Sequence, residues 1–160
     1  MMRSDELTLR PIGRVVRGRS PGAQDDHWEQ AEAEIEIDAT WAEALDGLEG
    51  FSHIWVVWWL DRFDGPPVQR KVRPERRQEM PLVGLLATRS PHRPNPLAMT
   101  AVRLLAHDGA RLRVQGLDAY EGTPVLDIKP YLRRGDLISE ATAPEWLNNL
   151  WRIHDEERES

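Results

Sequence analysis

Side chains able to bind or activate a ligand are concentrated in residues 88–95, which read T-R-S-P-H-R-P-N. This segment holds two arginines, a histidine, an asparagine and two hydroxyls, and it separates two apolar runs at 83–87 and 97–105. Prolines at positions 91, 94 and 96 fix their own φ and push each preceding residue towards extended geometry. A loop restrained in this way has little entropy left to lose on binding. The pattern therefore predicts a preorganised binding loop between two strands.

The chemistry of this loop depends mainly on its two arginines. Arg89 and Arg93 could each bind a carboxylate or a phosphate in bidentate fashion. Ser90, His92 and Asn95 would add hydroxyl, imidazole and amide groups to the same site. The closeness of Ser90 to His92 also suggests a hydrolase with a nucleophile and a base, but the sequence has no G-x-S-x-G elbow. An anion-binding loop is the favoured interpretation.

A second polar group lies between Asp118 and Tyr131, in the segment D-A-Y-E-G-T-P-V-L-D-I-K-P-Y. Its carboxylates at positions 118, 121 and 127 could hold hydroxyls, an amine or a cation. A ligand with a carboxylate, an amine, a ribose and a positive centre would use this group together with the arginines. S-adenosylmethionine is such a ligand, although the composition of the two groups does not select it.

Other common ligand motifs are missing from the sequence. It has no G-x-G-x-x-G after a strand and no P-loop. It has no cysteine, and its five histidines (27, 53, 92, 107 and 154) show no metal-ligand spacing. No metal site is therefore expected.

Short alternating segments predict the elements that would position these groups. Strands are expected at Leu7–Val16, Ala31–Ile37, Phe51–Leu60, Val83–Ala87, Leu97–Leu105 and Arg111–Leu117, with a further short strand inside Asp118–Leu132. Capping boxes predict a short internal helix at about 41–48 and a C-terminal helix at about 143–155. Regularly spaced strands with few helices favour a mainly β fold, a single β-barrel-like domain over residues 1–160 with its core at about 8–135.

Two of these elements carry many tryptophans. Phe51–Leu60 is almost continuously aromatic and β-branched, which is typical of a central strand covered on both faces. Within it, His53 is either a core histidine satisfied by a backbone partner or a ligand contact. The C-terminal helix has an apolar face that would serve as core or as a dimer contact, formed by Trp146, Leu147, Leu150, Trp151 and Ile153.

The charge of the chain is unevenly distributed. The net charge is -6, yet residues 62–103 hold nine Arg or Lys against three acids. A basic segment on an acidic body is compatible with a site for a polyanion or an anionic group. The long basic loop at 61–81 is either part of such a site or simply a solvated loop. No apolar stretch reaches the roughly 20 residues of a membrane span, so a soluble cytoplasmic protein is expected.

Four segments together resemble the TsaA-like (TrmO-type) family. They are A-T-R-S-P-H-R-P-N-P-L-A-M-T at 87–100, D-A-Y-E-G-T-P-V-L-D-I-K-P-Y at 118–131, P-I-G-R-V at 11–15 and G-L-E-G-F-S-H-I-W-V-V-W-W at 47–59. Characterised members are S-adenosylmethionine-dependent methyltransferases with a β-barrel core that work as dimers. The resemblance implies N6-methylation of threonylcarbamoyladenosine beside the tRNA anticodon, with S-adenosyl-L-methionine as cofactor, tRNA as partner and a homodimer as the assembly.

The resemblance also implies roles for particular residues. The cofactor-binding residues would be His53, Ile54, Arg89, Met99, Asp118, Ala119, Tyr120 and Glu121. The catalytic residues would be Asp127, Lys129 and Tyr131. The chemistry of the acceptor nitrogen calls for a general base that removes its proton, and this base would be Asp127 or a neighbour in the same segment. The substrate-binding residues would be Ser90, His92, Arg93 and Asn95, and Arg93 and the loop Arg70–Arg77 would meet phosphates of the RNA.

Two departures from the family leave the methyl acceptor open. Family members often carry an arginine-glutamine-proline loop after the first strand, whereas this chain has S-P-G-A-Q-D-D-H at 20–27, where only Gln24 matches. Longer bacterial members have a C-terminal domain that assists with tRNA, and this chain is expected to end after one helix. A methyltransferase of the same fold acting on a small molecule, or a non-catalytic module that binds the cofactor or RNA, are the alternatives.

Overall fold

The computed structural model describes residues 7–22, 27–66 and 69–159. The chain, expected from the sequence to be one domain, gathers into two compact units. The first contains the residues up to Asp61 together with Leu97–Tyr131, and the second contains Arg62–Pro96 together with Leu132–Ser160. No helix among the described residues is both long enough and apolar enough to span a membrane.

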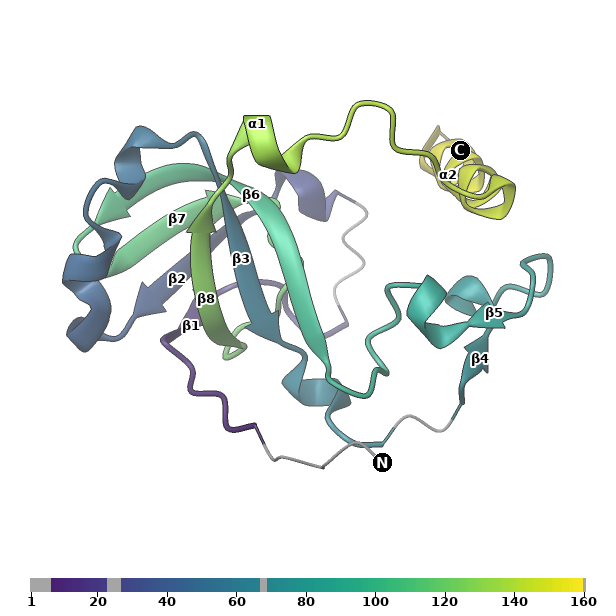
Figure 1. Ribbon diagram of the computed structural model, residues 1–160, viewed down its shortest axis with the longest axis horizontal. Coiled ribbons are helices and arrows are strands. Elements are labelled where there is room, and N and C mark those ends of the chain that lie inside the picture. The colour runs from purple at the N-terminus through teal and green to yellow at the C-terminus, as the bar shows by residue number, and fades with distance from the viewer. Residues whose placement is uncertain (1–6, 23–26, 67–68, 160) are drawn as a thin grey trace. The chain divides into compact units, whose positions relative to one another are not determined.

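The first unit is a closed barrel whose neighbouring strands all pair antiparallel, in the order β1-β2-β7-β6-β3-β8 (Figure 1). Its strands are β1 (Gly13–Arg17), β2 (Glu32–Ile37), β3 (His53–Trp59), β6 (Leu97–Asp108), β7 (Arg111–Gln115) and β8 (Pro124–Pro130). The predicted fold class, a mainly β barrel with a C-terminal helix, is confirmed.

Side chains that alternate along the strands fill the inside of this barrel with one core. In β2, Ala33, Ile35 and Ile37 are buried, while the glutamates between them face outwards. In β3, Ile54, Val56 and Trp58 are buried inside the barrel. Of the outward side chains of β3, His53 is exposed and the others are only half-buried, so the prediction that this strand is covered on both faces was wrong. The strand is nevertheless central, because it pairs with both β6 and β8.

The internal helix differs from its prediction. The segment after β2 forms two 3₁₀ helices, η2 (Ala39–Leu45) and η3 (Leu48–Gly50), and η1 (Trp28–Gln30) precedes β2. The residue that starts η2 is Asp38, which makes no side-chain capping bond, so the predicted box at Thr40 does not form. Gly47 has a φ of 86° between the two short helices. This left-handed residue stops the chain from continuing as one α-helix.

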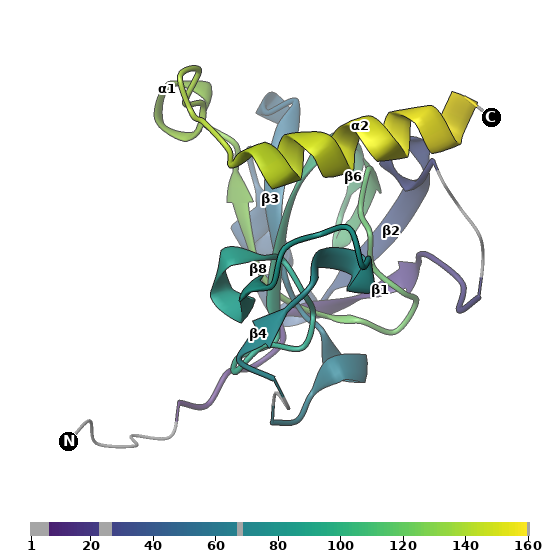
Figure 2. The same cartoon turned by 90° about the vertical axis from the view of Figure 1, so that its right-hand side faces the viewer.

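The second unit contains a two-stranded antiparallel sheet and the longest helix. The sheet pairs β4 (Lys71–Val72) with β5 (Val83–Gly84), and 3₁₀ turns follow each strand, η5 (Pro74–Arg76) and η6 (Leu85–Ala87). Another 3₁₀ turn, η4 (Asp61–Phe63), contains the boundary between the two units along the chain. Beyond the barrel come the short α1 (Arg133–Asp136) and the long α2 (Glu145–Glu159). Figure 2 shows α2 as one uninterrupted helix. On the predicted apolar face of α2, Leu150 is buried whereas Trp151 is 53% exposed.

One turn in the second unit has an unusual backbone. Glu75 and Arg76 have φ values of 52° and 57°, in the left-handed region that favours glycine. Such a conformation costs about 1–3 kcal/mol for each residue and persists only where the surrounding structure holds it. Local hydrogen bonds contribute, since the amide of Arg77 donates to the carbonyl of Pro74 at 3.1 Å and the Arg73 side chain donates to the carbonyl of Met80.

Candidate functional site

The register of the barrel places two predicted site residues in one row on its outer face. Val57 of β3 lies opposite Asp127 of β8 on one side and opposite Met99 of β6 on the other. Since neighbouring strands are about 4.8 Å apart, Asp127 and Met99 are separated by roughly 10 Å across the sheet. Met99 is 58% exposed, so this face presents an apolar side chain and a carboxylate together.

The next row of the same face holds Lys129, which forms an ion pair with Asp127. Its Nζ lies 2.8 Å from Asp127 Oδ2, as expected for residues i and i+2 that share one face of a strand. The hydrogen bond to Asp127 and the attraction of its charge raise the pKa of Lys129 above the ordinary value of 10.5. Lys129 is largely exposed and Asp127 is half-buried, so part of the Asp127 carboxylate is reachable by a substrate.

Aromatic side chains complete this outer face. The ring of Tyr131 lies 5.7 Å from that of Trp55 and 6.4 Å from that of His53. The amide of Tyr131 also donates to the carbonyl of His53 at 3.0 Å, which fixes the two residues side by side. His53 itself is exposed, and its Nδ1 lies 2.8 Å from Ser52 Oγ. Its position excludes the core-histidine alternative, and a ligand contact stays a prediction.

Two of the predicted cofactor residues lie in the core instead. The side chains of Ile54 and Ala119 are fully buried within the barrel core. The alternation of a strand explains Ile54, because its neighbours His53 and Trp55 point outwards and its own side chain must point inwards. Ile54 and Ala119 could therefore meet a ligand only through their main chains, and the carbonyl of Ala119 already accepts a hydrogen bond from the amide of Arg19.

The loop at 118–121 is organised by Arg19, which the sequence did not single out. The Arg19 guanidinium forms an ion pair with Asp118 and lies 6.0 Å from the centre of the Tyr120 ring. The carbonyl of Arg19 accepts from the amide of Glu121 at 3.3 Å. A cation two residues after the first strand was the available signal.

A glycine permits this arrangement of Arg19. A Cβ on Gly18 would meet the carbonyl oxygen of Ala119 at 2.5 Å, so only glycine allows this close approach of the two main chains. A cavity of about 220 Å³ opens beside them, lined by Gly18, Arg19, Ser20, Ala31, Glu32, Ala33 and Leu117. Gln24, the remaining match to the family's loop after the first strand, lies outside the described residues.

In the second unit, Arg93 is bound to its own loop. Its Nη1 donates to the carbonyls of Thr88 at 2.7 Å and Ser90 at 3.3 Å, the residues on either side of Arg89. The Thr88 hydroxyl adds support by donating to the carbonyl of Leu85 at 2.7 Å and accepting from the Ser90 amide at 3.2 Å. Through Nη1, Arg93 holds the main chain around Arg89, and its predicted contact with substrate phosphates stays a prediction.

Arg89 is left available by this arrangement. It is exposed and has no hydrogen bond or ion pair among the residues that the structure describes. His92 is exposed as well, and its ring meets that of Phe63 edge to face at 5.1 Å. Asn95 is also exposed. The sequence assigned the stiffness of this loop to its prolines alone, whereas the structure adds hydrogen bonds from Arg93 and Thr88. That the loop binds a ligand stays a prediction.

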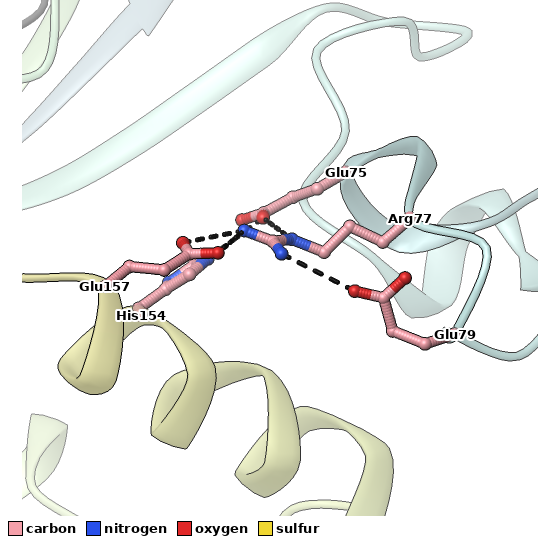
Figure 3. Close-up of polar contacts among 5 residues, drawn as sticks. All are labelled: Glu75, Arg77, Glu79, His154 and Glu157. Atoms are coloured by element: carbon pink, nitrogen blue, oxygen red, sulfur yellow. Dashed lines mark hydrogen bonds and ion pairs between the residues drawn. The ribbon is translucent and has the colours of Figure 1, made fainter. Parts of the chain in front are cut away.

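The basic loop Arg70–Arg77 is not uniformly basic in the structure. Arg77 is surrounded by the carboxylates of Glu75, Glu79 and Glu157 (Figure 3). Hydrogen bonds to Glu157 and then Glu75 raise the pKa of Arg77, so its guanidinium stays charged and is paired with these carboxylates. In contrast, Arg70, Lys71 and Arg76 are exposed and have no acidic partner among the described residues. The contact of the loop Arg70–Arg77 with phosphates stays a prediction, and these three cations have no acidic partner in the described part of the chain.

The predicted site residues are thus divided between the two units. The barrel carries His53, Met99, Asp118, Tyr120, Glu121, Asp127, Lys129 and Tyr131, and the second unit carries Arg89, Ser90, His92, Arg93 and Asn95. In the described part of the chain, no group of three or more His, Asp or Glu side chains is arranged to hold a metal ion.

The architecture defines a β-barrel protein whose outer sheet face carries a row of polar and aromatic side chains. The family model of the tRNA-methyltransferase O N-terminal domain matches residues 19–137. The chain therefore belongs to the tRNA-methyltransferase O family, and the resemblance seen in the sequence is confirmed.

Individual relatives place the chain more closely. It is 42% identical to a probable S-adenosyl-L-methionine-binding protein of Methanothermobacter thermautotrophicus, over 79% of this chain and 90% of that protein. It is 40% identical to the tRNA (adenine(37)-N6)-methyltransferase of Escherichia coli, over 64% of this chain but only 45% of that enzyme. The chain superimposes on a crystal structure of TrmO with a TM-score of 0.67 at 31% identity, covering 86% of this chain and 63% of the other.

Proposed function

We propose that the protein is an S-adenosyl-L-methionine-dependent methyltransferase that methylates the N6 nitrogen of adenosine 37 in tRNA, in its threonylcarbamoylated form. The observation that carries the proposal is the family match at 19–137, which contains both signature segments, 87–100 and 118–131. The name of the E. coli relative specifies this position and this atom of tRNA.

The residues of the proposed site fit the cofactor by their chemistry. Bound S-adenosylmethionine would supply an electrophilic methyl group on a sulfonium, together with an amine, a carboxylate and ribose hydroxyls. Exposed Glu121 and half-buried Asp118 offer carboxylates to hydroxyls or to an amine, and Arg89 offers a guanidinium to a carboxylate. Met99 offers an apolar contact, and His53 a ring nitrogen. The barrel residues thus complement the hydroxyls and the amine of the cofactor, and Arg89, in the second unit, complements its carboxylate.

The remaining residues would prepare the acceptor. In the reaction, the acceptor nitrogen forms a bond to the methyl carbon while the carbon–sulfur bond breaks, and the nitrogen loses one proton. Asp127 would accept this proton, because its carboxylate is accessible on the outer face. Lys129, at 2.8 Å, would keep that carboxylate oriented. Tyr131 and Trp55 form an aromatic surface on which an unstacked base could rest.

The proposal includes the partners of the protein. Arg70, Lys71 and Arg76 would meet tRNA phosphates, since each is exposed and without an acidic partner among the described residues. The protein would act in the cytoplasm as a homodimer, a state supported by the apolar side chain of Leu97, which is 40% exposed on the barrel strand β6. Sedimentation of the purified protein at two concentrations would test the dimer.

Labelled cofactor tests the reaction directly. The protein is incubated with methyl-labelled S-adenosylmethionine and with tRNA that either carries or lacks threonylcarbamoyladenosine. Label confined to the modified tRNA is the expected result, and Asp127→Asn should reduce the rate about 10²- to 10⁴-fold without loss of cofactor binding. No label in either tRNA would refute the acceptor. Label in a small molecule, or tight cofactor binding without turnover, would instead support one of the two alternatives.

A further inference from the structure

The C-terminal helix α2 lies beyond residue 137, where the match to the family ends. It is nevertheless bonded to a turn inside the matched part, the segment 73–80 between β4 and β5. Helix and turn belong to the same compact unit. This contact contributes neither to the barrel nor to the residues assigned to the cofactor, so a separate role is expected of it.

The contact has two points of attachment on one face of the helix. Nη2 of Arg77 donates to both carboxylate oxygens of Glu157, at 2.9 and 2.8 Å. One turn of helix earlier, His154 Nε2 lies 2.9 Å from Glu75 Oε2. The spacing of three residues between His154 and Glu157 puts both side chains over the same turn of the loop (Figure 3).

The turn itself ties these two points together. The same oxygen of Glu75 that faces His154 accepts from Nε of Arg77 at 3.1 Å, and Nη1 of Arg77 lies 3.5 Å from Glu79. Arg77 is only 25% exposed, so water screens these bonds less than it screens an open surface pair. The five side chains therefore form one connected network, which we call the helix clamp: Glu75, Arg77, Glu79, His154 and Glu157.

The helix clamp is attached at the place where the backbone is strained. Glu75 and Arg76 are left-handed without being glycine, at φ values of 52° and 57°. Neither residue is a glycine, so the local hydrogen bonds of the turn and the helix clamp are needed to hold this conformation. Glu75 is one of the strained residues, and Arg77 follows directly after the other. Release of the helix would allow the turn to relax into an ordinary conformation.

The conformation of this turn decides where nearby cations point. Arg76 is one of the two strained residues, and Arg70 and Lys71 lead into the turn through β4. All three are exposed and without an acidic partner among the residues that the structure covers. A relaxed turn would redirect Arg76 and increase the entropy that the loop loses when it binds a polyanion.

We propose that α2 positions the RNA-binding cations: Glu157 and His154 hold the strained turn so that Arg70, Lys71 and Arg76 are presented together to the phosphates of the RNA. Arg77 is then an internal anchor and makes no contact with RNA. The identity of the polyanion as tRNA rests on the proposed function, whereas the holding of the turn by the helix does not.

The holding of the turn can be measured without RNA. Glu157→Gln keeps the size of the side chain but removes its charge, and hydrogen exchange is followed at the amides of residues 73–80 in the full chain. Exchange should become about three- to tenfold faster, the range for partly screened charge-assisted bonds. The control is Glu156→Gln, because Glu156 pairs with Arg152 inside the helix at 2.6 Å and should leave the turn unchanged. Unchanged exchange in Glu157→Gln would overturn the proposal.

The functional role is measured by binding of tRNA. Glu157→Gln should weaken tRNA affinity about three- to tenfold while cofactor affinity, measured by calorimetry, stays unchanged. Arg77→Glu and Glu157→Arg should each cause a similar loss, and the double variant should recover part of it because the pair is restored with opposite signs. Tighter tRNA binding by Glu157→Gln would show that the carboxylate competes with phosphate, and it would overturn the positioning role.

These two measurements separate the inference from the proposed function. A wild-type protein that binds no tRNA would refute the proposed partner, and the exchange rates would still decide whether the helix holds the turn. In a protein that does bind tRNA, Arg76→Gln should lower the slope of log affinity against log salt by about 0.7–0.9. An unchanged slope would remove Arg76 from the contact and overturn the assignment of the presented cations.

Discussion

Arg93 offers the sharpest test of how the predicted binding loop works. Its guanidinium donates to the carbonyls of Thr88 and Ser90, which flank the exposed Arg89. Arg93→Ala removes both bonds without touching Arg89. We therefore expect the variant to lose cofactor affinity through a loosened loop and not through a lost contact with the ligand.

The magnitude follows from the two bonds. The bond to Thr88, at 2.7 Å, has full hydrogen-bond geometry, whereas the bond to Ser90, at 3.3 Å, is longer than usual. A hydrogen bond from a charged group contributes about 1.5–3 kcal/mol, and partial exposure moves this one to about 1–2 kcal/mol. A shift of this size changes the ratio of ordered to disordered loop by about five- to thirtyfold. The apparent cofactor affinity falls by at most the same factor, because only the ordered loop binds.

Calorimetric titration with S-adenosylmethionine measures this loss, and hydrogen exchange at residues 88–90 reports the loop without any ligand. Arg70→Ala is the matched control, since it removes an exposed cation of the same unit that has no acidic partner in the described part of the chain. It should leave both readouts unchanged. Arg93→Lys should be intermediate, because an ammonium reaches the carbonyls without the fork of a guanidinium.

Two results would refute this reasoning about Arg93. If cofactor affinity and exchange at residues 88–90 are both unchanged in Arg93→Ala, the two hydrogen bonds do not order the loop. If only tRNA affinity falls, and Arg93→Lys restores it, Arg93 binds phosphate directly as the sequence alone suggested. Either outcome would return Arg93 to the surface of the substrate site.

Three further predictions concern the fold, the cofactor and acid stability. Trp58→Ala should destabilise the protein by about 3–5 kcal/mol in urea unfolding, because Trp58 is a buried core residue; a loss below about 1 kcal/mol would contradict its place there. Arg89→Ala should weaken cofactor binding in calorimetry but leave thermal unfolding unchanged, and equal affinity would remove Arg89 from the site. Burial opposes ionisation of Glu75, but hydrogen bonds from His154 and Arg77 outweigh burial and lower the pKa of Glu75 below 4.5. The ionised carboxylate therefore stabilises the fold above pH 4.5, and this stabilisation is lost as the pH falls through the pKa of Glu75 in the folded protein. Glu75→Gln should therefore flatten the decline of stability roughly between pH 5 and pH 3, and an unaltered decline would contradict this assignment.

The strands were the most reliable prediction from the sequence, because side-chain alternation depends only on neighbouring residues in the chain. In β2 and β3, side chains of period two separate an inner from an outer face, and the buried residues Ala33, Ile35, Ile54 and Val56 follow that period. The same alternation corrects the prediction that the Ile54 side chain binds the cofactor, since it turns Ile54 inwards between His53 and Trp55. A motif gives a stretch of residues, whereas the pleat decides which of them can reach a ligand.

Patterns that depend on a partner segment were less reliable. The apolar run 83–87 was expected to be a strand, but only Val83–Gly84 pairs. Its partner β4 ends at Val72, shortly before Pro74, and a proline cannot donate to a ladder. Without further pairing, the chain continues as a 3₁₀ turn that buries Leu85. A run of apolar residues does not reveal how long its partner will be.

The sequence by itself determined the family, the barrel and the loop that presents Arg89, because these depend on motifs and short periods along the chain. It also showed that residues 62–103 are basic. Only the tertiary structure decided what each cation does. Arg93 folds back onto its own loop, Arg77 is enclosed by carboxylates that include Glu157, and Arg70, Lys71 and Arg76 remain available. Charge is a property of composition, but its pairing depends on distances between residues as far apart in the sequence as 77 and 157.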